Sequence, residues 1–285
     1  MTYQIQQIIT FAAYGCPVTS IDRRSVLRAA AGTAAGGALA AGCGDGHAVR
    51  AAARPAPSTD PTASPHTPAA PGSRTEPAAL PALPPGLPDQ IAHGPSGRPM
   101  VALTFHGQGD PKEAEALLTE AERVGAGLTV LAVGSWLEAY PAMARRVLDG
   151  GHELGNHTEN HRDINAMPAS QAAAEIEQCA QRLRRLTGGV GRWFRPSQAQ
   201  YASPSVLRLA RRAGYPHVLS YDLDSLDYTD PGADAVRDTV LGHVRGGSVV
   251  SLHFGHPGTV AALPAILDGL RQRGLRAVTV SRMLA

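Results

Sequence analysis

Two histidines stand four residues apart in the string NHTENH, residues 156–161. At that spacing on a helical turn both side chains lie on one face, so His157 and His161 can reach the same ion. A pair of solvent-exposed histidines is the alternative. The pair directly follows the predicted strand that begins HELG, and loops at strand ends commonly carry ligands. The sequence therefore predicts a metal site at His157 and His161.

Other predicted strands also end in chemically useful side chains. VALTFHG places His106 at one strand end, and SVVSLHF places His253 at another. Such an imidazole can act as an acid or base or bind a metal, although a hydrogen-bonded core histidine is the alternative for His253. Arg195, in WFRPS, can orient a carboxylate, hold an anion or form a plain salt bridge.

The stretch YDLDSLDY supplies three carboxylates, Asp222, Asp224 and Asp227. By the two-residue period of a strand, Asp222 and Asp224 share a face and Asp227 lies in the turn beyond. We expect at least one of them only to form a turn or cap a helix.

These side chains need a scaffold that gathers several strand ends. Predicted strands cover residues 100–105, 128–133, 152–157, 192–196, 217–223, 248–254 and 277–280, and predicted helices cover 111–124, 135–148, 169–186, 204–213, 233–244 and 260–273. Repeated βα units imply an α/β fold with parallel strands and helices outside. About seven strands favour a distorted (β/α) barrel, whose chemistry lies at the carboxyl ends of the strands.

Residues 1–43 have the features of an export signal. Arg23 and Arg24, in SIDRRSVLR, precede the small apolar run AAAGTAAGGALAAG and then Cys43. This order is typical of a twin-arginine signal on a lipoprotein, so we expect lipidation of Cys43 and anchoring at the extracellular face of a bacterial membrane. A plain cleaved signal and secretion are the alternative. Residues 1–19 fit neither scheme and are interpreted as an extension before the true start.

The composition divides the remainder into a linker and one domain. Segment 44–98 is rich in proline and alanine and poor in large apolar residues, so it is predicted to be a disordered linker before a domain at 99–285. The net charge of +2 gives no reason to expect nucleic acid as a partner. Cys179 lies in a predicted helix and is expected in the core. We expect a monomer.

Five stretches resemble, in order, the motifs of the polysaccharide deacetylase family, also called the NodB-homology domain or carbohydrate esterase family 4. The resemblance covers nearly all of residues 99–285. HTENH at 157–161 matches the second motif, H-[ST]-x-x-H, in full. The third, fourth and fifth motifs are similar to FRP, DSLDY and LHF, and TFHG at 104–107 matches the first motif, TFDDG, in part.

The resemblance implies a distorted (β/α) barrel and metal-assisted removal of acetyl groups from a carbohydrate polymer, such as a cell-wall polysaccharide. A divalent ion, expected to be zinc, would polarise the amide and activate water. His106, His157 and His161 are its expected ligands.

The resemblance also implies roles for five other residues. His253 protonates the departing amine and is oriented by Asp227. Arg195 belongs to the catalytic group, while Tyr228 and Leu252 are expected to contact the substrate.

The first motif departs from the family. Where the family has a catalytic aspartate and a metal-binding aspartate, this chain has His106 and Gly107. Phe254 replaces another aspartate, and Tyr228 replaces a tryptophan.

Three outcomes remain open. His106 is a third ligand with the base from elsewhere, for which Asp224 is a candidate; or His106 is the base and Asp110 reaches the metal; or catalysis has been lost. The string DPKE at 110–113 has the pattern of a helix N-terminus, which favours His106 as the ligand. A nearby Arg195 would lower the pKa of an imidazole and keep it neutral, as a ligand requires. The chain is therefore an exported deacetylase or a catalytically silent relative that binds glycan.

Overall fold

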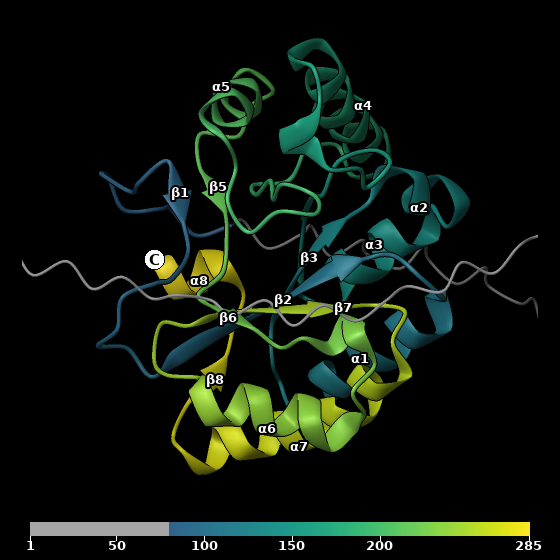
Figure 1. Ribbon diagram of the computed structural model, residues 1–285. Helices are drawn as coiled ribbons and strands as arrows, with labels where there is room; N and C mark the ends of the chain where they lie inside the picture. The colour runs from purple at the N-terminus through teal and green to yellow at the C-terminus, as the bar shows by residue number, and fades with distance from the viewer. Residues whose placement is uncertain (1–79) are drawn as a thin grey trace, which may run out of the picture. The chain divides into compact units, whose positions relative to one another are not determined.

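The computed structural model describes residues 80–285, which form a mostly parallel sheet surrounded by helices (Figure 1). The main sheet has the order β4-β3-β2-β7-β6, and β8 pairs with the start of β2. These strands are β2 (Met100–Gly107), β3 (Leu128–Ala132), β4 (Glu153–Asn156), β6 (Leu223–Asp224), β7 (Val249–His253) and β8 (Arg276–Ala277). All of these pairings are parallel, so the carboxyl ends of the strands meet at one edge.

The sheet curves onward into a distorted barrel. Phe194 bridges Asn156 on one side and Val218 on the other, which joins β4 to β5 (Val218–Leu219). Strand β1 (Gln90–Ile91) then runs parallel to β5. This arrangement confirms the predicted α/β fold class.

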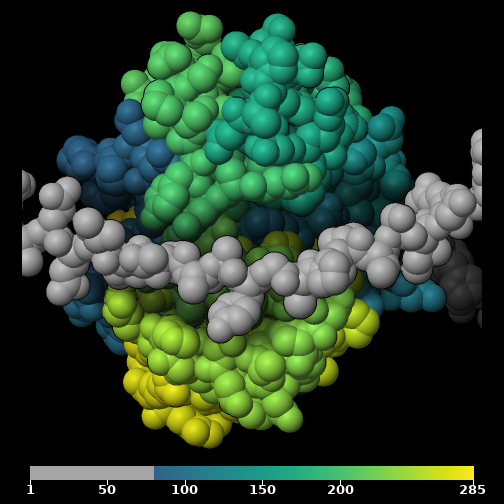
Figure 2. Space-filling view, viewed as in Figure 1, coloured from purple at the N-terminus to yellow at the C-terminus, as the bar shows by residue number. Residues whose placement is uncertain are grey.

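Helices cover the outside of the strands. They are α1 (Pro111–Arg123), α2 (Gly134–Ala139), α3 (Ala142–Asp149), α4 (Ala169–Thr187), α5 (Pro204–Arg212), α6 (Ala233–His243), α7 (Pro257–Gln272) and α8 (Val280–Leu284), with short 3-10 turns η1 (Ile164–Ala166) and η2 (Asp227–Thr229). In the space-filling view, α4 and α5 form one side of the displayed face and α6 and α7 form the opposite side (Figure 2). The apolar faces of α1, α2, α6 and α7 share one buried cluster with β2, β3 and β7. This packing fixes the strand ends that carry the polar side chains.

Several predicted elements differ from the structure. The predicted helix 135–148 is two helices, because Tyr140 and Pro141 separate α2 from α3. The predicted strand 192–196 is reduced to the bridging residue Phe194. The predicted strand 277–280 ends after Ala277, where the side chain of Thr279 begins α8 by accepting the N–H of Arg282.

The predicted linker extended too far. Residues 80–98 include β1, and Ile91 is buried at 2% exposure in a cluster with Trp193 and Leu219. The domain therefore begins before residue 99. The predicted signal, the lipidation site Cys43 and the linker up to residue 79 lie outside the described residues. Within 80–285, no helix is long and apolar enough to cross a membrane.

Candidate functional site

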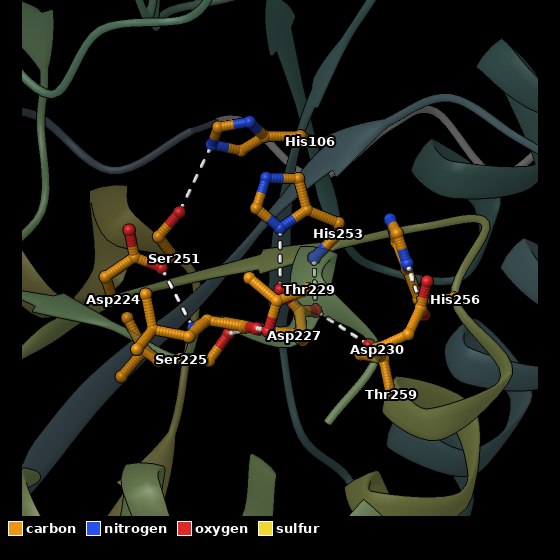
Figure 3. A network of polar contacts seen from close by, with 12 residues as sticks. His106, Asp224, Ser225, Asp227, Thr229, Asp230, Ser251, His253, His256 and Thr259 are labelled. Carbon is orange, nitrogen blue, oxygen red and sulfur yellow. Dashed lines mark hydrogen bonds and ion pairs between the residues drawn. The ribbon is translucent and has the colours of Figure 1, made fainter. Parts of the chain in front are cut away.

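Neighbouring strands bring two of the predicted histidines side by side. His106, the last residue but one of β2, pairs in register with His253 at the end of β7, and their ring centroids are 4.2 Å apart. Both imidazoles belong to one network of polar contacts with residues of β6 and η2 (Figure 3). The strand ends therefore converge as the sequence predicted.

His106, His157 and His161 form a compact cluster. One nitrogen of each ring lies within 4.8 Å of the corresponding nitrogens of the other two. The ring centroids of His106 and His157 are 4.3 Å apart, and those of His157 and His161 are 4.9 Å apart. His157 is completely buried, and His106 is 8% exposed. Imidazole nitrogens at such separations can ligate one divalent ion, and zinc commonly takes three protein ligands in open sites.

The hydrogen bonding of His157 fits a metal. Its Nδ1 lies 3.0 Å from the carbonyl oxygen of Arg195, which can only accept, so Nδ1 carries the proton. The other nitrogen, Nε2, then has a free lone pair, and it is buried without any partner. Ligating histidines typically donate their second N–H to a carbonyl or carboxylate in this way. The Nε2 of His106 lies 3.3 Å from Oγ of Ser251, a hydroxyl that can either accept or donate a hydrogen bond, so this contact does not fix the tautomer of His106.

Burial keeps these rings neutral. Desolvation is the largest cause that holds the pKa of both His106 and His157 well below the ordinary value, and neighbouring histidines lower it further. The charge of Arg195 also lowers the pKa of His106, whereas the hydrogen bond to the Arg195 carbonyl raises that of His157 in part. The pKa of His161 is also lowered, first by desolvation and then by His253. A neutral imidazole is the form that binds a metal, so the cluster needs to lose no proton at neutral pH.

The two histidines of NHTENH meet by a route that the sequence analysis did not predict. Residues 157–161 form an irregular loop after β4, so the expected helical turn is wrong. Thr158 and His161 instead adopt left-handed backbone conformations, with φ of 69° and 53°. The Asn156 carboxamide oxygen accepts the N–H of Thr158 at 2.8 Å, which supports the first of these turns.

His253, which is partly exposed, and buried Asp227 form a hydrogen-bonded pair beside the cluster. His253 Nδ1 lies 2.7 Å from Oδ1 of Asp227, and the His253 backbone N–H donates to Oδ2 at 2.8 Å. Thr259, in the first turn of α7, donates to Oδ2 at 2.7 Å. Burial raises the pKa of Asp227, but the bonds from His253 and Thr259 outweigh it and lower the pKa overall. The carboxylate thus orients the ring and leaves Nε2 of His253 available for proton transfer.

Arg195 is fully buried without a carboxylate. Its guanidinium donates to Oγ1 of Thr104 at 2.8 Å and to the carbonyl oxygens of Ser220 at 3.0 Å and Leu219 at 3.3 Å. Its Nη1 has no partner, and no salt bridge to Arg195 occurs within residues 80–285. Burial lowers the pKa of Arg195 to about 9, so it remains charged at neutral pH. In this structure Arg195 ties β2 to the end of β5 and to Ser220, and its place in the catalytic group stays a prediction.

The two predicted substrate contacts separate. Tyr228 is 48% exposed, and its ring stands edge-on to His253 with centroids 5.3 Å apart, so it lies at the mouth of the site. Leu252 is completely buried in the hydrophobic cluster, which corrects the expectation that its side chain contacts substrate. The position of Leu252 follows from the alternation of side chains in β7, because His253 faces the site and its neighbour Leu252 faces the helices.

The remaining carboxylates mostly hold the backbone. Asp110 caps α1 by accepting the N–H of Lys112 at 2.9 Å, as the sequence predicted. Asp222 accepts from Ser248 and from the N–H of Val249, and Asp224 accepts the N–H of Leu226. Asp110 does not belong to the histidine cluster.

Sequence reasoning missed four polar contributors. Ser251 precedes His253 by two residues and shares its face, so strand alternation could have identified it. Thr259 gave no such signal, because its contact depends on how α7 docks. A second pair, His256 and Asp230, lies at the rim with Nδ1 and Oδ1 2.8 Å apart (Figure 3).

Comparisons with known proteins show which proteins this chain is similar to. A family model described as polysaccharide deacetylase matches residues 93–218. The chain is 32% identical over 203 residues to a peptidoglycan-N-acetylglucosamine deacetylase of Bacillus cereus, covering 67% of this chain and 90% of that protein. It is 29% identical over 194 residues to a chitooligosaccharide deacetylase of Sinorhizobium fredii, covering 63% of this chain and 89% of that protein.

Solved structures share the fold. A CE4 family pseudoenzyme from Bacillus anthracis matches with a TM-score of 0.66 at 20% identity, covering 70% of each chain. The Bc1960 peptidoglycan N-acetylglucosamine deacetylase matches with a TM-score of 0.65 at 25% identity, covering 69% of this chain and 92% of that one. Because this chain is 32% identical to a relative over 67% of its own length and 90% of that protein's length, the chain belongs to the polysaccharide deacetylase family.

Proposed function

We propose that this protein is a metal-dependent hydrolase that removes N-acetyl groups from an amino-sugar polymer of the cell wall. The observation that carries the proposal is the buried, unpartnered Nε2 of His157 within a cluster of three histidines, beside a hydrogen-bonded His253–Asp227 pair. The named activities of the relatives, on peptidoglycan and on chitooligosaccharides, support this substrate class.

In this proposal His106, His157 and His161 hold a divalent ion, for which zinc fits the donor set. The bound ion supplies Lewis acidity, which polarises the amide carbonyl and makes water a better nucleophile. Tyr228, exposed at the mouth, presents an aromatic surface to the sugar.

Proton transfer falls to the His253–Asp227 pair. Asp110 caps a helix and Asp224 holds its own turn, so both are committed elsewhere. His253 Nε2 takes a proton from the attacking water and then gives it to the departing amine, while Asp227 stabilises the transient imidazolium. The C–N bond breaks, and the products are acetate and the free amino sugar.

The test is acetate release by the purified full-length chain, with zinc or cobalt supplied, from N-acetylglucosamine oligomers and peptidoglycan fragments. We expect turnover that is lost in His253→Ala while the metal stays bound. Exposed His243, on α6, provides a matched control, and His243→Ala should remain active. A metal-loaded chain that releases no acetate from either substrate would overturn the proposal.

A catalytically silent glycan-binding protein is the second candidate function. The observation that favours it is the presence of His106 and Gly107 where the family motif has two aspartates. Binding of chitin or peptidoglycan fragments without acetate release would establish this alternative.

We also propose that the protein is exported and anchored through Cys43. Support comes from Arg23, Arg24 and the small apolar run before Cys43. Replacing both arginines by lysine should block export, and Cys43→Ala should release the protein from the membrane. If Cys43→Ala leaves the membrane-bound fraction unchanged, a plain signal becomes the better interpretation.

A further inference from the structure

The loop between the two clustered histidines has a backbone that its residues do not favour. We call residues 157–161 the ligand loop. Thr158 and His161 both have positive φ, although neither is glycine, and side chains with a Cβ disfavour this conformation. Yet the two left-handed residues bring His157 and His161 to the same side. Contacts from outside the loop must therefore stabilise it.

Helix α4 holds the loop at Asn160. The Glu175 carboxylate accepts the backbone N–H of Asn160 at 2.7 Å and its side-chain amide at 2.9 Å. Glu175 is only 5% exposed, so it places a buried carboxylate directly before His161. A bidentate acceptor of this kind fixes both the position and the orientation of its donor residue.

The same helix holds the loop at Glu159. Arg182 Nη2 lies 2.5 Å from Oε1 of Glu159, which is 5% exposed, and 3.1 Å from Oε2 of Glu138 in α2. A Cβ added to Gly134 would lie only 1.9 Å from Oε2 of Glu159, so the start of α2 closes tightly over this carboxylate. Gly134 N–H also donates to the carbonyl oxygen of Thr158 at 2.9 Å.

The two anchors share one face of α4. Glu175 and Arg182 are seven residues apart, which is close to two helical turns, and buried Cys179 lies between them. Helices α2 and α4 pack against each other on this side of the fold (Figure 1). Packing alone does not require charged side chains on a buried helix face, because burying a carboxylate is costly unless it is paired. Both charges are directed at the two residues that separate Thr158 from His161.

We propose that Glu175 and Arg182 are positioning residues, which hold the ligand loop so that His157 and His161 face one ion. The inference rests on the proposed metal site and assigns the geometry of that site to α4. Residues that only stabilise the fold would, when lost, lower the stability of the metal-free protein. Loss of Glu175 or Arg182 should instead weaken metal binding more than it lowers that stability.

The test compares variants of the full-length chain in three measurements. These are zinc affinity by chelator competition, the absorption spectrum of the cobalt-substituted protein, and the Tm of the metal-free protein. The variants are Glu175→Ala and Arg182→Met. Their controls are Glu177→Ala and Arg185→Met, which alter exposed positions of the same helix.

Glu175→Ala and Arg182→Met should each weaken zinc binding about 10-fold, the lower end of what loss of an outer partner costs. That factor corresponds to about 1.4 kcal/mol less stabilisation by saturating zinc. The cobalt spectrum should change, because the angle between the two imidazoles changes. The controls should match the unmodified protein.

A second variant guards against misfolding. Glu175→Gln keeps an acceptor for the Asn160 N–H, so it should bind zinc within about threefold of the unmodified protein, as expected when one modest hydrogen bond is exchanged. If Glu175→Ala or Arg182→Met loses metal-free stability but retains zinc affinity and the cobalt spectrum, the positioning role is refuted. If the unmodified chain binds no metal, the proposed function itself fails, and the two failures are thus distinguishable.

Discussion

Gly107 stands where the family motif has its second aspartate, and the structure leaves no room for a side chain there. A Cβ at this position would lie 2.9 Å from Cγ1 of Val130 and 3.1 Å from Cα of Ala132. The second of these contacts is with backbone, which cannot move aside as a flexible side chain can. We therefore expect that Gly107→Ala destabilises the protein and that Gly107→Asp, which also buries a carboxylate, destabilises it more.

Overpacking of a buried site typically costs about 1–3 kcal/mol. For a domain of this size, each kcal/mol lowers Tm by about 2–4 °C. The assay is thermal and urea unfolding of the metal-free protein, so that changes in metal binding do not contribute. Gly97→Ala is the matched control, because a Cβ there would meet nothing within 4 Å.

Val130→Ala provides an internal check, since it removes Cγ1 from the clash. In that background Gly107→Ala should cost less by about 0.5–3 kcal/mol, the usual range for residues in contact. If Gly107→Ala is as stable as the unmodified protein, the steric reasoning is wrong.

Three further predictions concern the site. His106→Ala and His157→Ala should lower zinc affinity by comparable factors of about 100-fold or more, because loss of a ligand costs more than loss of a residue that hydrogen-bonds to a ligand. Full affinity in His106→Ala would identify His106 as a base. Asp227→Asn should keep its metal while acetate release falls by about 10²–10⁴-fold; unchanged turnover would remove the role of Asp227. The metal-free protein should lose stability as pH falls below 6.5, because burial lowers the pKa of His106 and His157 and the unfolded chain therefore binds protons first. Each ring should cost about 1.4 kcal/mol per pH unit until its folded pKa is reached, and urea unfolding that gives equal stability at pH 7.5 and 5.5 would contradict this.

The elements could be predicted where periodicity and end signals agree. Helix α1 begins at Pro111 with Asp110 as its cap, as the string DPKE indicated. The predicted strand 217–223 was wrong because the chain changes neighbours within it. Ser220 N–H donates to Ile91 of β1, whereas Asp222 N–H donates to Val249 of β7. This change of neighbouring strand depends on how strands distant in the sequence pack together, so the hydrophobic pattern alone cannot predict it.

The site, like the fold, has features that the sequence predicts and features that it does not. Polar residues at strand ends could be found from the sequence, because parallel strands must end at one edge, and His106, Arg195 and His253 lie there as expected. The spacing of His157 and His161 also identified a pair, but the helical turn inferred for it was wrong.

Spacing reports which residues lie near each other along the chain, and it cannot report that the loop between them is held by a distant helix. The contact between Glu159 and Arg182 joins residues 23 apart and exists only after α4 has docked on the sheet. The conformation of this loop, with its two left-handed residues, therefore depends on tertiary structure. Its capacity to hold an ion depends on the charges of Glu175 and Arg182, which lie outside the motif H-[ST]-x-x-H. A relative could keep every letter of H-[ST]-x-x-H and still lose the site through a change in α4.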